Sequence, residues 1–339
     1  MTPLVSVIIA VYNGEQHIEE CLNSILCQTF QQWECIIVND GSTDKTPSII
    51  DRFVAQDARF SSYTLTPNSG FAKISFEKGL TYAKAEWVFR IDHDDYIDTD
   101  ALEKLYYRAL DTKADTVITR MIFFEDSNPK ESYPLPSSDF PMDQIITGRE
   151  AVLLTIPNWK IGLNGTLSKR HLLISSANNA THMSVEEYES RELLMISKTV
   201  AFVDTNYYYR QHPQGISKKP AVKLFHYLIT DKMLEEFIQK HFDETHVYEF
   251  RLKRFHALIY FEEVLYKSGR LMSKNDRREA KRIIKKHYLD LDKKQIYKNS
   301  IKKRLLYTQW YVLFRFAIHH PKFISIIRKV FRKLYKIRP

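Results

Sequence analysis

The sequence predicts an α/β protein with a mostly parallel sheet flanked by helices, followed by a helical, basic C-terminal extension. Over residues 1–120, short apolar runs rich in β-branched residues alternate with segments whose apolar residues recur at helical spacing. Strands that alternate with helices in this way form parallel sheets covered by helices. A further observation is charge, because residues 293–339 contain 14 Lys and Arg but no Asp or Glu.

The predicted elements follow one another regularly in the N-terminal part. Residues 5–11 form a continuous apolar run, which is typical of a strand buried on both faces. Ser42 or Thr43 is expected to cap the second helix, which runs through Phe53. The other strands are predicted at 33–38, 60–65 and 87–91, and the other helices at 15–26 and 74–83.

The chain is long enough for more than one unit. Its 339 residues are 44% hydrophobic and 27% charged, which excludes wholesale disorder. Residues 125–145 are rich in Pro, Ser and Asp and predict a loop or irregular insert. We expect one domain over residues 1–220, with halves at 1–120 and 121–220, and a helical region over 221–339.

The basic tail indicates an acidic partner. The first 292 residues carry 36 basic and 41 acidic side chains, so the net charge of +9 comes from the tail. Apolar residues at helical spacing between 324 and 334, with Lys and Arg between them, predict a basic amphipathic helix that binds a membrane surface. The alternative is a helix packed on the body of the protein. Nucleic-acid binding is not expected, because no recognised module accompanies the charge.

We expect a cytoplasmic protein that is peripherally attached to the inner leaflet of the cell membrane. No signal peptide is evident at the N-terminus. The longest apolar stretch of the tail, residues 310–318, has nine residues and contains Arg315. A membrane span needs about 20 apolar residues.

The strongest chemical signal is the cluster Asp92-His93-Asp94-Asp95 after the predicted fourth strand. Three carboxylates within four residues repel one another unless a cation or hydrogen-bond donors offset the cost. Mg²⁺ or Mn²⁺ suits oxygen ligands of this kind, with diphosphate oxygens completing the shell. The alternative is a solvated acidic turn.

Asp40 is the second signal. It also lies at the carboxyl end of a predicted strand, where ligands bind in parallel α/β sheets. Its carboxylate is suited to accept a hydrogen bond from a nucleobase N–H. The alternative is that Asp40 and Asp44 only cap the following helix.

Together these segments resemble the family 2 inverting glycosyltransferases, which have the GT-A fold, a Rossmann-like arrangement of a mostly parallel sheet and flanking helices. The order and spacing of the segments also match. The resemblance is strong over residues 1–120 and weaker to about residue 220. The matching segments are Val5–Asn13, Val38–Asp44, Asn68–Gly70 and Asp92–Asp95.

The resemblance implies roles for individual residues. Asp40 would contact uracil or another base, Asp92 would face the ribose, and Arg210 would contact the diphosphate. The implied nucleotide-sugar ligands are Ala10, Tyr12, Glu15, Asp40, Lys73, Asp92, His93 and Arg210, and the implied metal ligands are Asp94 and His212. For His212, the alternative is a structural histidine.

The general base is expected within Val185–Tyr188. Members of the family usually carry Glu-Asp in this half, and one of the two carboxylates takes the proton from the acceptor hydroxyl. Glu187 falls where the Asp is expected and is the first candidate for the base, and Glu186 is the second candidate. The alternative is that both are exposed helix glutamates without a catalytic role.

Three positions depart from the pattern of the family. Ala10 replaces a Pro, and Glu187 replaces an Asp. The Arg-Asn that often follows the Asn-x-Gly turn is absent, which leaves Lys73 to supply a positive charge.

The resemblance implies an inverting transfer of a hexosyl or N-acetylhexosaminyl group from a nucleotide-sugar, which we expect to be a UDP-sugar. The implied acceptor is a glycan or a lipid-linked glycan in the synthesis of a bacterial surface polysaccharide. Two alternatives stay open. A metal-dependent nucleotidyltransferase would need a Gly-rich loop bearing Lys or Arg, and none is visible. The other is a catalytically inactive nucleotide-sugar-binding or membrane-scaffold protein.

Overall fold

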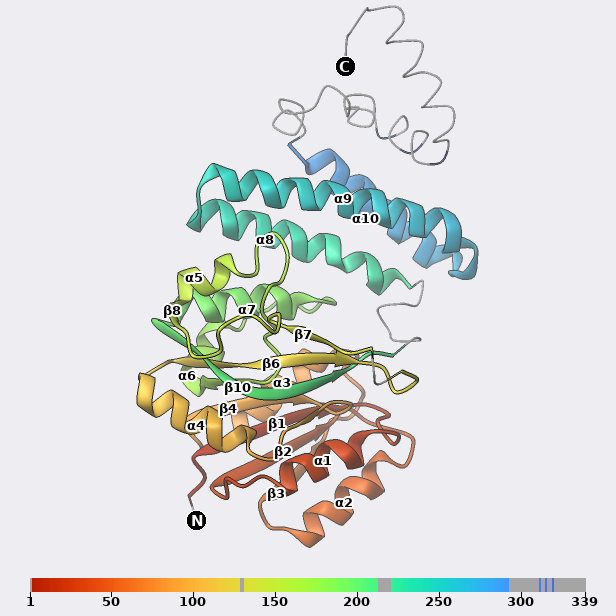
Figure 1. The fold of residues 1–339 in the computed structure, drawn as a ribbon. Coiled ribbons are helices and arrows are strands. Elements are labelled where there is room, and N and C mark those ends of the chain that lie inside the picture. The colour runs from red at the N-terminus through yellow and green to blue at the C-terminus, as the bar shows by residue number, and fades with distance from the viewer. Residues whose placement is uncertain are drawn as a thin grey trace, which may run out of the picture. The chain divides into compact units, whose positions relative to one another are not determined.

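The computed structural model describes residues 2–128, 131–212 and 221–292, together with Tyr311, Arg315 and His319 (Figure 1). The chain divides into two compact units. The N-terminal unit comprises Met1–Thr181 and Val185–Pro213, and the helical unit comprises His182–Ser184 and Gln214–Pro339. The amphipathic helix expected between residues 324 and 334 lies outside the described residues.

The N-terminal unit is built on a sheet whose first part is parallel. β1 (Val5–Val11) lies between β2 (Trp33–Asn39) and β4 (Trp87–Asp92), and β2 pairs in turn with β3 (Phe60–Thr64). All three of these pairings are parallel. The strand order β3-β2-β1-β4 reverses direction between β1 and β4, and such a switch point opens a crevice at the carboxyl ends of the strands.

Beyond β4 the pairing is mixed. The order continues β9-β6-β10-β5, in which β9 is antiparallel to both β4 and β6, whereas β6 and β10 are parallel. The insert predicted at 125–145 contains β7, which pairs with β6, and ends at β8. The strands are β5 (Tyr96–Ile97), β6 (Thr116–Phe124), β7 (Tyr133–Leu135), β8 (Ile145–Thr147), β9 (Thr166–Lys169) and β10 (Thr199–Arg210).

Helices cover both faces of this sheet, which confirms the predicted α/β class. Val7 and Ile9 of β1 belong to the larger apolar core, and Ile8 belongs to a second core on the other face. This explains the uninterrupted apolar run, because a strand buried on both faces has no solvent side. The larger core receives α1 (Ile18–Leu26), α2 (Thr46–Gln56) and α4 (Ala101–Thr112), and the second core receives α3 (Ala72–Tyr82). The remaining helices are α5 (Gly148–Leu153), α6 (Arg170–Ser176) and α7 (Val185–Ile196).

The predicted cap of α2 is wrong, because the helix begins at Thr46 and neither Ser42 nor Thr43 caps it. The Oγ of Ser42 instead accepts a hydrogen bond from the N–H of Asn13, at 2.9 Å, and the N–H of Thr43 donates to the Oδ1 of Asn13, also at 2.9 Å. Asp44 Oδ1 accepts from the N–H of Thr46 at 3.0 Å. The segment before α2 therefore ties the loops after β1 and β2 together.

The helical unit consists of packed helices with a separate apolar core. Phe225, Phe255 and Ile284 are fully or almost fully buried in it. Among the described residues, no helix combines the length and the apolar content that a membrane span requires. The elements are η2 (Val222–His226), α8 (Tyr227–His241), α9 (Glu244–Ser268), η3 (Gly269–Leu271) and α10 (Lys274–Asp290).

Candidate active site

The predicted nucleotide ligands lie along one edge of the sheet. Ala10 pairs in register with Asp92, the last residue of β4. Asp40 follows β2 and donates its N–H to the carbonyl of Val11 at 2.8 Å. Tyr12 follows β1 directly and is 48% exposed. These four predicted ligands are therefore brought together at the switch point.

The Asp40 carboxylate is buried and holds the turn at residues 68–70. Its Oδ1 accepts from the N–H of Ser69 at 2.8 Å, and its Oδ2 accepts from the Oγ of Ser69 at 2.8 Å and from the N–H of Gly70 at 3.3 Å. Of the two residues that could cap α2, Asp44 therefore contacts the start of that helix, whereas Asp40 fixes the turn beside the crevice. Its contact with a nucleobase stays a prediction.

Glu15 follows Gly14 in the loop after β1, and the His93 ring packs on Gly14. Glu15 Oε2 accepts from the N–H of Lys45 at 3.0 Å and so reinforces the joined loops after β1 and β2. A Cβ at Gly14 would come within 2.4 Å of the His93 ring. A glycine is therefore required for the His93 ring to pack this closely on the loop after β1.

The three carboxylates of the acidic cluster have different environments. Asp95 is buried, with Oδ2 accepting from the Tyr207 hydroxyl at 2.5 Å and Oδ1 accepting from the N–H of Arg210 at 2.8 Å. Burial raises the pKa of the Asp95 carboxyl well above its usual range, and the charges of Asp94 and Asp92 add to this rise. Asp95 therefore anchors the loop to β10.

Asp92 is held by two residues that the sequence analysis missed. Asn164 donates from Nδ2 to Asp92 Oδ2 at 3.1 Å, and Arg90 Nη2 lies 3.4 Å from Oδ1. Arg90 lies two residues before Asp92 on the same strand. A polar residue in an otherwise apolar strand is a sequence signal that could have identified it. Asn164 carried no such signal, because its approach depends on the fold.

The structure brings the two predicted metal ligands together. His212 Nε2 and Asp94 Oδ2 are 2.9 Å apart, and both side chains are partly exposed. Two neighbouring ligands of one octahedral ion, each about 2.1 Å from it, are separated by about 3 Å. Among the residues that the structure describes, no group of three or more His, Cys, Asp or Glu side chains is arranged for a metal. The pair thus fits an ion that takes its remaining ligands from a diphosphate and water.

Arg210 is engaged by protein groups. Its guanidinium contacts the carboxylates of Glu20 and Asp126, and its Nε donates to the carbonyl of Asp94 at 2.8 Å. The His17 ring lies 5.1 Å from the His212 ring. Burial lowers the pKa of His17, and the charges of Arg210 and His212 lower it further. The predicted diphosphate contact of Arg210 would have to compete with these two carboxylates.

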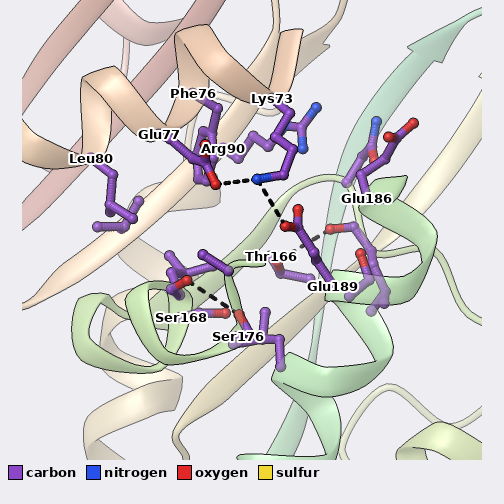
Figure 2. Close-up of a pocket in the computed structure, with 17 residues that line it drawn as sticks. Lys73, Phe76, Glu77, Leu80, Arg90, Thr166, Ser168, Ser176, Glu186 and Glu189 are labelled. Atoms are coloured by element: carbon purple, nitrogen blue, oxygen red, sulfur yellow. Dashed lines mark hydrogen bonds and ion pairs between the residues drawn. The ribbon is translucent and has the colours of Figure 1, made fainter. Parts of the chain in front are cut away.

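A pocket of about 90 Å³ lies between α3, α7 and the strands β4 and β9, and its lining includes Arg90 and Asn164, the two residues that hold Asp92. Lys73 of α3 lines it and contacts Glu77, while Glu189 Oε1 of α7 lies 3.1 Å from its Nζ (Figure 2). Although burial alone would lower the pKa of Lys73, these carboxylates outweigh it and raise the pKa. Lys73 therefore joins α3 to α7, and its predicted role toward the nucleotide-sugar stays a prediction.

The two candidate bases begin α7 but have different neighbours. Glu186 lines the pocket with Arg90 and Asn164, the two residues that hold Asp92. Glu186 is an exposed residue, in agreement with one part of the alternative interpretation, yet the protein atoms around its carboxyl raise its pKa by desolvation.

Glu187 is held by a fully buried arginine. Arg191 donates from Nη1 to the Glu187 carbonyl at 2.8 Å, and the same nitrogen lies 3.7 Å from Glu187 Oε2. Thr155 accepts two further hydrogen bonds from Arg191, and the Trp159 ring lies 4.0 Å from its guanidinium. The start of α7 is therefore firmly positioned, with Glu187 beside a cation.

Comparison with known proteins bears on this arrangement. Residues 6–162 match the family model described as Glycosyl transferase family 2, a segment that contains Asp40 and the acidic cluster. The N-terminal part of the chain therefore matches glycosyltransferase family 2. The match ends before Glu186, Glu187 and His212, which therefore rest on geometry and on the resemblance.

Curated relatives of this glycosyltransferase agree with the assignment. Glycosyltransferase GlyG of Streptococcus pneumoniae is 28% identical over 225 residues, which are 64% of this chain and 74% of the relative. The putative glycosyltransferase EpsH of Bacillus subtilis is 29% identical over 227 residues, which are 66% of this chain and 65% of the relative. The protein is thus a glycosyltransferase enzyme.

A solved structure confirms the GT-A type of fold. S. aureus TarS 1-349, in complex with UDP-GlcNAc, superposes with a TM-score of 0.64 over 95% of this chain and 92% of that one. The sequences are 17% identical, so the likeness concerns the fold.

Proposed function

We propose that this glycosyltransferase moves a sugar, with inversion, from a UDP-sugar to a glycan or lipid-linked acceptor in the synthesis of a surface polysaccharide. The observation that carries the proposal is the acidic loop at the switch point, which contains Asp92 and the Asp94 that pairs with His212. Asp92 contacts Arg90 and Asn164, which line a pocket together with Glu186. The UDP-GlcNAc complex of the TarS structure supports a UDP-sugar as donor. The acceptor and its polysaccharide rest on the family resemblance.

The donor would bind across the carboxyl edge of β1, β2 and β4. Asp40 would present its remaining acceptor capacity to a base N–H, and Asp92, oriented by Asn164 and Arg90, would face the ribose. A divalent ion held by Asp94 and His212 would neutralise the diphosphate as it leaves. Tyr207 and Asp95 would keep the loop in place during this step.

The base would act from the start of α7. In an inverting transfer one carboxylate removes the acceptor proton while the hydroxyl attacks the anomeric carbon. Two features favour Glu186: its position in the pocket and its raised pKa, which makes it a stronger base. Glu187, the choice from the resemblance, lies beside the buried guanidinium of Arg191, whose Nη1 is 3.7 Å from Glu187 Oε2.

Two single variants separate these candidates. Glu186→Gln and Glu187→Gln each keep the shape of the side chain and remove its basicity. The variant of the true base should lose about 10²- to 10⁴-fold in kcat, with little change in donor binding measured by calorimetry. The other variant serves as the matched control. If neither lowers kcat, the base lies elsewhere.

Hydrolysis of nucleotide-sugars tests the proposed function as a whole. We would incubate the protein with UDP-, GDP-, TDP- and CMP-sugars, with and without Mn²⁺, and measure the released nucleoside phosphate. Manganese-dependent release of UDP from one sugar is expected. Binding of UDP without release from any sugar, in the presence of a glycan acceptor panel, would favour the inactive binding protein. Failure to bind any of these nucleotides would overturn the proposal.

A further inference from the structure

The last described helix of the helical unit, α10, carries its cations on one side. Successive helical residues are rotated by about 100°, so its seven cationic residues fall within an arc of about 180°. Its three acidic residues, Asp276, Glu279 and Asp290, fall outside this arc. The cationic face of α10 consists of Lys274, Arg277, Arg278, Lys281, Arg282, Lys285 and Lys286.

This cationic face is exposed and almost free of ion pairs. All seven side chains belong to exposed residues. Within the described part of the chain, Arg282 is the member of the face that forms an ion pair, with Glu279 at 3.6 Å, and its side chain is 79% exposed. The buried side of α10, including Ile283, Ile284 and Tyr288, packs into the core of the helical unit. The like charges are therefore held close together on a rigid support, and their mutual repulsion is relieved when anions approach.

Two exposed leucines flank the cationic residues of α10 in the sequence. Leu271 ends η3 shortly before α10 and is 80% exposed, and Leu289, in the last turn of α10, is 56% exposed. Leu289 falls within the same arc as the cations, given the rotation of about 100° per residue. A single exposed leucine is ordinary, but a leucine within the arc of the cations and a second one shortly before α10 match a surface that is both anionic and apolar.

We propose that the cationic face of α10 binds the anionic surface of a lipid bilayer, with Leu271 and Leu289 entering the headgroup region. Each Lys or Arg near an anionic leaflet contributes about 1 kcal/mol, so several act together. A soluble polyanion would match the cations but would leave the leucines in water, which is why we favour lipid. The proposal goes beyond glycosyl transfer and does not depend on it. It also concerns residues distinct from those of the helix expected between 324 and 334.

Co-sedimentation of the full chain with vesicles tests the charge component. Vesicles of phosphatidylcholine alone and of phosphatidylcholine mixed with phosphatidylglycerol would be compared. The variant with Lys274, Arg278, Lys281 and Lys285 changed to Gln should bind the mixed vesicles about 100- to 1,000-fold more weakly, since each cation contributes about 1 kcal/mol. No ion pair of the described residues involves these four positions, so folding should be preserved, and far-UV circular dichroism would check it.

A matched control removes the same net charge from another place. Lys84, Lys113, Lys160 and Lys198 are exposed lysines of the N-terminal unit. Their change to Gln should leave vesicle binding within about threefold of the unmodified protein, because these lysines do not belong to the cationic face of α10. An equal loss in both variants, or no loss in the α10 variant, would overturn the proposal.

The leucines distinguish lipid from a soluble polyanion. Leu271→Ser together with Leu289→Ser should weaken binding to mixed vesicles by about tenfold, because each leucine loses part of the roughly 1.5–3 kcal/mol gained on full burial. Binding to heparin, used as the soluble polyanion, should not change. If the leucine variant binds vesicles like the unmodified protein while the α10 charge variant loses heparin binding, the face binds a polyanion and the lipid proposal is wrong.

Discussion

One carboxylate in each unit illustrates a different environment for a negative charge. In the helical unit, Glu235 of α8 is buried and accepts from the Nε of Arg251 at 2.6 Å, and Arg254 contacts its other oxygen. In the N-terminal unit, Asp94 has one side-chain partner at hydrogen-bond distance among the described residues, His212, and a quarter of its side chain is exposed. Glu235 is satisfied by the protein, whereas Asp94 retains oxygen lone pairs for a ligand.

The difference separates a structural charge from a functional one. A buried charge with all its partners supplied by the fold stabilises one packing and is costly to disrupt. A charged side chain with few partners in the protein contributes little to the free energy of unfolding, so its removal is tolerated by the fold. Its charge is needed when a ligand binds. Asp95 shows that both kinds occur within one loop, since it is closed off by Tyr207 and Arg210.

The largest expected effect is that of Asp94→Asn. The variant should lose about 10³-fold or more in kcat for donor hydrolysis, because it removes charge from the site that is to hold the ion beside the diphosphate. Its free energy of unfolding should change by less than about 1 kcal/mol, as for most partly exposed sites. Steady-state kinetics over a range of Mn²⁺ concentrations and urea unfolding provide the two measurements. A large loss of stability would place Asp94 with the structural charges.

Glu235→Gln should show the reverse pattern. It leaves Arg251 and Arg254 without their shared buried carboxylate, which should cost about 3–5 kcal/mol in the free energy of unfolding. Donor hydrolysis by the folded fraction should be unchanged. Glu236→Gln is the matched control, because Glu236 is exposed and pairs with Lys232 on the surface of α8, at 3.2 Å. It should cost at most about 0.5 kcal/mol.

His287 sharpens the comparison, because it is a buried titratable group whose Nδ1 has no hydrogen-bond partner among the described residues. Burial lowers its pKa to about 4, and the charge of Arg254 contributes to the shift. The unfolded chain therefore binds a proton between about pH 6.5 and pH 4 that the folded chain does not. Stability should fall by up to about 3 kcal/mol as the pH drops through this window.

Urea unfolding followed by far-UV circular dichroism at several pH values would measure this fall. His287→Gln removes the titrating group and should flatten the profile between pH 6.5 and pH 4. An identical pH profile in the variant and the unmodified protein would show that other groups determine the acid sensitivity.

The smallest expected effect is that of Tyr207→Phe. It removes the hydroxyl that donates to the buried Asp95 carboxyl and accepts from the N–H of Asp92 at 3.2 Å, which should cost about 1–3 kcal/mol of stability. If Asp95 positions the loop, the variant should also raise KM for the donor. Tyr208→Phe is the control, because its hydroxyl donates to Asp98 at 3.0 Å and lies outside the acidic cluster. Equal effects of the two variants on KM would argue against a special role for Asp95.

Much of the fold could be predicted because its signals are local. The apolar run at residues 5–11 and the helical periodicity of α1 reflect burial of one short segment at a time, and both elements lie close to where they were expected. The position of the acidic cluster after β4 follows from the same periodicity, since a strand that turns from apolar to acidic has reached the edge of the sheet. The start of α2 was misjudged, because Ser42 bonds to Asn13 from another loop.

By itself, the sequence determined the alternation of strands and helices, the acidic loop and the family. The tertiary structure decided which carboxylates are surrounded by hydrogen-bond donors of the protein and which remain accessible to a ligand. Asp95 meets Tyr207, which is 112 residues away in the chain, and Lys73 meets Glu189 on another helix. The one-sided charge of α10 was present in the sequence, but its exposure depends on which side of the helix the core of the helical unit buries. The physical reason is that local periodicity reports burial, whereas the partner of a buried charge is supplied by whatever segment the fold brings beside it.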